Sequence, residues 1–263
     1  MTPHAYRAPL VLLKDLGITE PQEINIEAIA QHCGATIVYE ALEGCEARII
    51  GSGDRAIITV NRSSPRGRQR FSGGHELGHW LWDRGKAALA CTEASLNEEW
   101  GKESLEQRAN RYAADLLLPE FMFRPRAVRR EVTFSTVKEL SEQFQTSMTA
   151  TAIRLVEFGS FPAMVICTET GKRRWFVRGP EVPEKLWPLE SPRSGTVAND
   201  LHRSKPWEKG PLDVYSDQWF DYPGARRHGV REDSIRITGA LVLTLLWWKD
   251  ERPLIEMGES EDS

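Results

Sequence analysis

Apolar positions recur at intervals of three and four along three stretches of the first 120 residues. This spacing places apolar side chains on one face of an α-helix, and it predicts helices over 25–33, 68–82 and 104–118. Gly34 follows the first stretch and supplies the backbone freedom that a helix end needs, while Pro119 closes the last stretch. The amino-terminal part of the chain is therefore expected to be largely helical.

Short apolar runs between the first two helices predict a small sheet. Three runs have the length of strands, at 35–42, 47–50 and 56–60. Residues 51–54, which read Gly-Ser-Gly-Asp, separate the last two runs and provide the turn geometry of a hairpin. A sheet is thus expected to precede the second helix.

Two further helical patterns, 134–144 and 147–158, form a helix-turn-helix outline with Gln145 and Thr146 in the turn. The second helix is expected to turn four polar side chains outward, of which one is a cation: Thr149, Thr151, Arg154 and Glu157. DNA recognition requires several cationic and base-reading side chains. The pattern therefore favours a packing role for these helices over contact with DNA.

The composition changes near residue 160, and nine of the fifteen prolines lie beyond it. Strand-like runs at 163–168 and 173–178 flank a turn, and two more strands are expected at 234–238 and 240–248. The prediction is an α+β fold with three parts: a domain over 1–120, a helix-turn-helix-like helical segment over 121–160, and a C-terminal α/β domain over 161–263.

Composition and charge narrow the class of protein. The 263 residues are 40% hydrophobic and 27% charged, which excludes a disordered or fibrous chain. With a formal charge of −4, the chain as a whole has no electrostatic attraction to nucleic acid or to an anionic membrane, so any basic surface must be local. The longest apolar run, 240–248, is about half of what a bilayer requires, and the amino end lacks the features of a signal peptide. Four cysteines without C-x-x-C spacing fit reduced thiols, so a cytoplasmic protein is expected.

Residues 75–79 read His-Glu-Leu-Gly-His, an H-E-x-x-H motif within the second predicted helix. Residues four apart lie one helical turn above each other, so the imidazoles of His75 and His79 can reach one metal ion. Glu76 lies about 100° around the helix from His75, where it cannot easily join the coordination but can accept a proton from a water molecule on the metal. The motif therefore predicts a metal site with Glu76 as the general base.

A catalytic zinc site requires a third protein ligand and an open coordination position. Acidic residues downstream of the motif supply the candidates: Asp83, Glu93, Glu98, Glu99, Glu103 and Glu106. Glu106 is favoured, because residues 104–107 read as a capping box that places its carboxylate in the first turn of the third helix. Asn110, one turn later, can hydrogen-bond a ligating histidine. Asp83, four residues after His79, is the alternative ligand.

Two local features of the motif helix leave alternatives open. Gly73 and Gly74 each cost about 1 kcal/mol relative to Ala inside a helix, so either the helix begins late or its backbone makes a close approach there. Trp80 and Trp82 lie two residues apart and cannot share a face. One of them is expected in the core and the other at a cleft.

Two segments together are far more specific than H-E-x-x-H alone: residues 68–79, RQRFSGGHELGH, and residues 106–119, EQRANRYAADLLLP. They resemble the ImmA/IrrE family of metallopeptidases, and the second matches the family pattern E-x-x-A-N-x-F/Y-A-A-x-L-L-x-P. With the preceding hairpin and Asn61, the likeness covers about residues 25–120. It implies a zincin-like domain that binds one divalent ion, Zn²⁺ or alternatively Mn²⁺. The ligands and the catalytic residue that it implies are His75, His79 and Glu106, with Glu76 as the base.

The sequence departs from the family at the glycine pair 73–74, where larger residues are usual, and at Asp83, where many members carry another His. These departures concern the helix start and the groove rather than the ligand set. The layout of the whole chain is similar to the longer, three-domain members related to the radiation-response regulator IrrE. Their last domain is GAF-like, which implies a sensing role for residues 161–263.

The resemblance also implies a substrate. Family members cut a dedicated helix-turn-helix repressor once and thereby relieve repression of stress or mobile-element genes. The chain is therefore expected to be a metal-dependent endopeptidase acting on such a repressor. The alternative is a DNA-binding transcription regulator with a structural metal site. A structural site is normally closed and four-coordinate, whereas two His and one Glu leave the position that catalysis needs.

Overall fold

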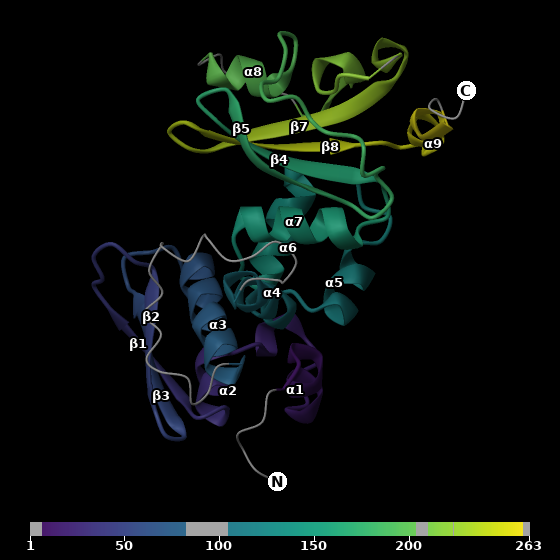
Figure 1. Ribbon diagram of the computed structural model, residues 1–263. Helices are drawn as coiled ribbons and strands as arrows, with labels where there is room; N and C mark the ends of the chain where they lie inside the picture. The colour runs from purple at the N-terminus through teal and green to yellow at the C-terminus, as the bar shows by residue number, and fades with distance from the viewer. Residues whose placement is uncertain (1–6, 83–104, 204–209, 223, 260–263) are drawn as a thin grey trace. The chain divides into compact units, whose positions relative to one another are not determined.

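The computed structural model describes residues 7–82, 105–203, 210–222 and 224–259 (Figure 1). The chain forms two compact units: unit 1 comprises residues 1–123 and 141–147, and unit 2 comprises residues 124–140 and 148–263. Each unit combines helices with a sheet, which confirms the α+β class. The segment 121–160 is divided between the two units, and the boundaries expected at 120 and 160 stay predictions. No helix within the described ranges is long and apolar enough to cross a bilayer.

The sheet of unit 1 has three strands in the order β1-β3-β2: β1 (Ala35–Glu40), β2 (Ala47–Ser52) and β3 (Arg55–Asn61). β2 and β3 pair antiparallel through the predicted hairpin, in which Gly53 has a φ of 59°. β1 runs parallel to β3. Helix α3 (Arg66–Trp82) packs on β2 and β3, and the sheet buries a row of apolar side chains that includes Ile49, Ile58 and Val60.

The other helices of this part of the chain are α1 (Pro9–Asp15), α2 (Ile26–His32) and α4 (Leu105–Leu117), with a 3₁₀ turn, η1 (Pro21–Glu23). The three predicted helices are confirmed, whereas the pattern did not predict α1. Asn25 caps α2 by accepting the N–H of Ala28 on its Oδ1 (2.9 Å). Gly34 ends the helix region with a φ of 79°, which a residue with a side chain rarely adopts.

Helix α3 runs without a break through the glycine pair before the motif, so it does not begin late. The close approach is instead confirmed. A Cβ built at Gly74 would lie 3.3 Å from the Cβ of Ala113, and one at Gly78 would lie 3.1 Å from the Cβ of Tyr112 and 3.2 Å from the Cα of Ala109. Small residues four apart on both helices therefore let the backbones of α3 and α4 pack closely.

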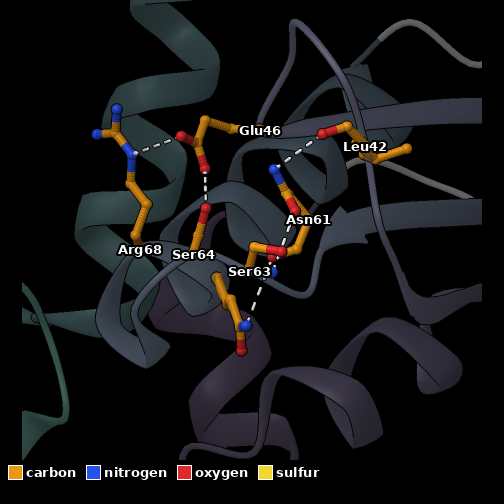
Figure 2. A network of polar contacts seen from close by, with 7 residues as sticks. Leu42, Glu46, Asn61, Ser63, Ser64 and Arg68 are labelled. Carbon is orange, nitrogen blue, oxygen red and sulfur yellow. Dashed lines mark hydrogen bonds and ion pairs between the residues drawn. The ribbon is translucent and has the colours of Figure 1, made fainter.

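A network of polar contacts holds the connection between β3 and α3 (Figure 2). The Nδ2 of Asn61 donates to the Leu42 carbonyl (3.2 Å). Ser64 donates its hydroxyl to one carboxylate oxygen of Glu46 (2.5 Å), and the Nε of Arg68 lies 3.9 Å from the other. Because Arg68 belongs to the first turn of α3, these contacts fix where the helix starts relative to the sheet.

The predicted helix pair is confirmed as α6 (Phe134–Phe144) and α7 (Met148–Phe158), which follow α5 (Glu120–Ala127). The expectation that α7 turns four polar side chains outward is wrong for two of them. Thr151 is fully buried, and Arg154 is 6% exposed with its guanidinium 4.9 Å from the centre of the Phe158 ring. Since Arg154 is the cation of that face, α7 has a packing role here.

The turn between α6 and α7 packs against α3 within unit 1. Arg70 donates through Nη1 to the side chain of Gln145 (3.2 Å) and through Nη2 to the carbonyl of Ile24 (2.9 Å). A Cβ at Gly67 would lie 2.8 Å from the backbone nitrogen of Ser147. The amino-terminal half of α3 is therefore held by close contact of its backbone with the turn between α6 and α7, as well as by side-chain hydrogen bonds.

The sheet of unit 2 has five strands in the order β5-β4-β8-β7-β6, antiparallel at every pairing. They are β4 (Ala163–Glu169), β5 (Lys172–Arg178), β6 (Leu212–Tyr215), β7 (Gly229–Thr238) and β8 (Leu241–Trp247). The predicted hairpin and the two later strands are confirmed. The proline-rich stretch also holds β6 and α8 (Val197–His202), which the pattern did not predict. The remaining elements are the 3₁₀ turns η2 (Ser216–Gln218) and η3 (Ala225–Arg227) and the helix α9 (Arg252–Glu259).

A buried carboxylate ties the irregular stretch of unit 2 to its sheet. Glu232 on β7 is fully buried and accepts hydrogen bonds from the Ala198 N–H (2.8 Å), the Ser234 hydroxyl (2.9 Å) and the Trp219 indole N–H (3.2 Å). Burial raises the pKa of Glu232, and these donors counteract that effect. The carboxylate therefore anchors both α8 and the Trp219 side chain on β7.

Gly78→Ala is expected to lower the free energy of unfolding by about 1–3 kcal/mol, because the added methyl group meets the backbone of α4. This loss outweighs the gain of about 1 kcal/mol that replacing a helical glycine gives when there is room. Denaturant unfolding followed by circular dichroism measures the change. Gly239→Ala is the control, since a Cβ there has no atom within 4 Å. A Gly78→Ala protein as stable as the parent would contradict the close packing.

Candidate metal centre

The two histidines of the motif point at each other from one face of α3. Their four-residue spacing stacks them one turn apart, and their rings meet edge to face with centroids 4.7 Å apart. The Nε2 atoms of His75 and His79 are 3.1 Å apart. His79 is buried and His75 is mostly buried, so both nitrogen lone pairs converge on one small space.

Glu106 reaches the same space from the first turn of α4. One carboxylate oxygen lies 3.2 Å from the Nε2 of His75, and the other lies 3.3 Å from the Nε2 of His79. These three side chains form a group whose possible ligand atoms all lie within 4.8 Å of one another. The residue favoured in the sequence as third ligand therefore lies beside both histidines.

The donor set fits a divalent transition metal. Two nitrogen ligands at about 2.0–2.1 Å from one tetrahedral ion would lie about 3.3 Å apart, close to the separation of the two Nε2 atoms. Two imidazole nitrogens and one carboxylate also form the ligand set of known catalytic zinc sites. His75, His79 and Glu106 could therefore hold one ion without rearrangement of α3 or α4.

Asn110 orients the first histidine. Its Oδ1 lies 2.9 Å from the Nδ1 of His75, and an amide oxygen only accepts, so Nδ1 carries the proton and Nε2 keeps its lone pair. Burial, and secondarily the neighbouring His79, lowers the pKa of His75, while Glu106 opposes this effect. A neutral imidazole with a free Nε2 is the form that binds a metal, and the hydrogen bond expected from the sequence is confirmed.

Glu76 lies next to His75 in the chain but outside the ligand group. Its side chain is 2% exposed, and within the described residues the group that could hold an ion comprises two histidines and Glu106 without it. This is compatible with a residue that acts as a base rather than as a ligand. The role of Glu76 stays a prediction.

The two tryptophans of α3 occupy different environments, as expected. Trp80 is buried, donates its indole N–H to the carbonyl of Cys33 (2.9 Å) and lies so close to β2 that a Cβ at Gly51 would be 2.6 Å from its ring. Trp82 is exposed, with the guanidinium of Arg108 5.1 Å from the centre of its ring. Trp80 therefore anchors the part of α3 that carries the two histidines to the sheet.

The other third-ligand candidates lie outside the described residues: Asp83, Glu93, Glu98, Glu99 and Glu103. So does Ser104, the first residue of the predicted capping box. The sequence analysis did not identify Gly78, Ala109 and Ala113 as residues that bring the candidate ligands together. The four-residue spacing of Gly74 with Gly78, and of Ala109 with Ala113, was the signal that could have identified them.

A family model described as the IrrE N-terminal-like domain of peptidase M78 matches residues 30–156. The chain carries an IrrE N-terminal-like domain. This family is one of metallopeptidases, and the matched range contains the whole ligand group. It extends past residue 120 and includes α5, α6 and most of α7, so the IrrE-like domain reaches further than the sequence motifs alone indicate.

Comparison with solved structures supports the fold of both units, with eleven matching chains. One is a Mycobacterium tuberculosis transcriptional regulator, with 12% sequence identity and a TM-score of 0.58. The match covers 91% of this chain and 74% of that chain. At this identity the likeness shows the fold alone. No curated protein matches the sequence.

Glu106→Ala is expected to reduce the divalent metal content of the purified protein sharply, because it removes one of three donors. Elemental analysis after dialysis against a weak chelator measures the metal content. Glu142→Ala, which removes an exposed carboxylate from α6, is the control and should keep its metal. Full metal retention by Glu106→Ala would transfer the ligand role to another acid, such as Asp83 or Glu103.

Proposed function

We propose that the IrrE-like domain is a metal-dependent endopeptidase in which His75, His79 and Glu106 hold one divalent cation. The observation that carries this proposal is the convergence of two imidazole nitrogens and one carboxylate, from two helices, within 4.8 Å. Zn²⁺ suits this donor set best, and Mn²⁺ is the alternative. When bound, the cation supplies a Lewis acid that polarises the scissile carbonyl and acidifies water.

The protein side chains perform the remaining steps. Glu76 takes the proton from the attacking water and passes it to the leaving amine, as a general base and then a general acid. Asn110 keeps His75 in the tautomer that binds the cation. The contact of Gly74 and Gly78 with α4 keeps Glu106 in reach of both histidines. Each role uses a group that α3 or α4 already orients.

A transcription regulator with a structural metal site is the alternative function. A structural zinc site has four protein ligands, whereas the group found among the described residues has three. The burial of Thr151 and Arg154 also leaves α7 without the polar face that a recognition helix requires. Both observations favour the peptidase.

The substrate we propose is a helix-turn-helix repressor, cut once in an extended segment. Support comes from β2, an edge strand of the sheet in unit 1, which lies against Trp80 of the metal-bearing helix. An extended peptide can add to such an edge as a further strand. Ile50 and Ile57 are paired across β2 and β3, and both side chains are more than half exposed. They offer apolar contact to a peptide bound near this edge.

Selectivity for one protein must come from this strand edge and from docking surfaces outside it, since a one-ion site can hydrolyse any peptide bond that reaches it. The fold of this chain is similar to that of the solved transcriptional regulator, which is compatible with a role in transcriptional control. Action on a repressor requires a cytoplasmic location, which stays a prediction.

Glu76→Gln tests the general base. The substitution keeps the shape of the side chain but cannot accept the proton, so peptide cleavage should fall by at least about 100-fold while the metal content stays that of the parent. Cleavage is followed by gel electrophoresis and metal by elemental analysis of the same sample. Continued cleavage at the parental rate by metal-loaded Glu76→Gln would remove Glu76 from the base role.

Narrow specificity is tested with two substrates. The metal-loaded protein should cut its cognate repressor, expected to be encoded nearby, at one site and leave casein intact. Mass spectrometry of the products identifies the bond. A chelator-treated sample is the control and should leave both proteins uncut. Broad digestion of casein, or an intact repressor under conditions that keep the metal bound, would contradict the substrate proposal.

A further inference from the structure

The edge strand β5 of unit 2 and the irregular segment after it bring together a group of aromatic and guanidinium side chains, here called the stacking cluster: Arg173, Phe176 and Arg178 from β5, and Trp187 from the segment. The rings of Phe176 and Trp187 meet edge to face with centroids 5.1 Å apart. The guanidinium of Arg173 lies 5.0 Å and 5.9 Å from the two ring centres, and that of Arg178 lies 5.2 Å and 5.3 Å from them. Two cations are thus held against two rings.

The stacking cluster has an exposed ring and unused hydrogen-bond donors. Trp187 is 60% exposed, so its indole offers a planar surface to solvent. Arg178 donates to the carbonyls of Pro183 and Glu184, which fixes the segment that carries Trp187. The guanidinium of Arg173, in contrast, has no hydrogen-bond or ion-pair partner within the described part of the chain. It stacks on the rings while its N–H groups remain available.

The strand that carries the stacking cluster is locally basic, although the whole chain has a formal charge of −4. Lys172–Arg178 contains four cations in seven residues. Lys172 pairs with Glu190 at 3.7 Å and Arg174 with Glu169 at 3.5 Å, and all four of these side chains are exposed. Exposed pairs of this kind contribute little free energy. Their cations can therefore exchange a carboxylate for a phosphate.

We propose that the stacking cluster binds single-stranded nucleic acid. One base stacks on the indole of Trp187, and the adjoining phosphates contact Arg173 and Lys172. An exposed aromatic ring beside cations that are free or only weakly paired is the combination that single strands use, because each nucleotide presents both a planar base and an anion. A duplex hides its base faces, so it can use the cations but not the ring. An acidic protein segment would likewise leave the indole without a partner. This binding is independent of the proposed peptidase activity.

Fluorescence anisotropy with a labelled oligothymidylate and the full-length protein tests the proposal. We expect binding that weakens as salt rises and that Trp187→Ala reduces about 5- to 150-fold, the range for loss of one base–aromatic stack. Arg173→Ala should also weaken binding and lower its salt dependence. Trp187→Phe, which keeps a planar ring, should retain most of the affinity.

Matched variants separate this site from general electrostatics and from a structural role. Tyr215, 61% exposed on the opposite edge strand β6, controls for exposed aromatic surface, and Tyr215→Ala should bind as the parent does. Arg174→Ala controls for charge on the same strand and should weaken binding less than Arg173→Ala. If Trp187→Ala lowers the melting temperature, its loss of binding could reflect unfolding. The proposal is then judged from the affinities of Arg173→Ala and Trp187→Phe.

Three results would overturn the proposal. The first is no binding of the oligothymidylate at low salt. The second is equal affinity for the corresponding duplex, which would mean that charge alone attracts nucleic acid. The third is tighter binding of a labelled oligo-glutamate peptide with the same dependence on Trp187 and Arg173, which would assign the stacking cluster to an acidic protein partner.

Discussion

The geometry of the candidate metal centre depends on how closely α3 and α4 approach each other. A Glu side chain is short, so the carboxylate of Glu106 meets both Nε2 atoms only if the helix backbones are almost in contact. Gly74 and Gly78 make this possible, although each weakens α3 by about 1 kcal/mol as an isolated helix. Tertiary packing determines whether a helix forms in a folded protein, and here packing against α4 compensates for that weakness.

Helix α3 is also held by three further sets of hydrogen bonds, so several separate contacts fix the positions of its histidines. The Trp80 indole bonds to the loop after α2, the Arg70 guanidinium bonds to the Ile24 carbonyl, and the Asn61 network holds the turn before the helix. A site built on a helix held in this way is more precise than one built on a loop. His75 and His79 are therefore oriented during folding, and binding of a metal ion does not have to order them.

The parts that could be predicted from sequence are those that depend on neighbours within a few residues. The spacing of His75 and His79, the hairpin around Gly53 and the hydrogen bond from His75 to Asn110 all follow from helix or turn periodicity and the family pattern. The choice between a late helix start and a close approach at the glycine pair could not be made, because the close approach of Gly74 is to Ala113 on a partner helix about forty residues away. The burial of Arg154 was missed for the same reason, since an arginine in a helical pattern looks exposed until its packing partners are known.

The stacking cluster and strand β6 were beyond prediction for a different reason. They depend on a proline-rich stretch with no helical or strand period, so that Trp187 meets Phe176 through an irregular path that no local rule describes.

The location of the proposed ligands on separate helices has a consequence for folding. His79 and Glu106 are 27 residues apart in the sequence, so one ion held by both closes a chain loop of that length. Ordering such a loop costs conformational entropy that grows with the logarithm of its length. A bound ion would thus act as a reversible cross-link, and the cohesion of α3 with α4 would depend on metal supply as well as on packing.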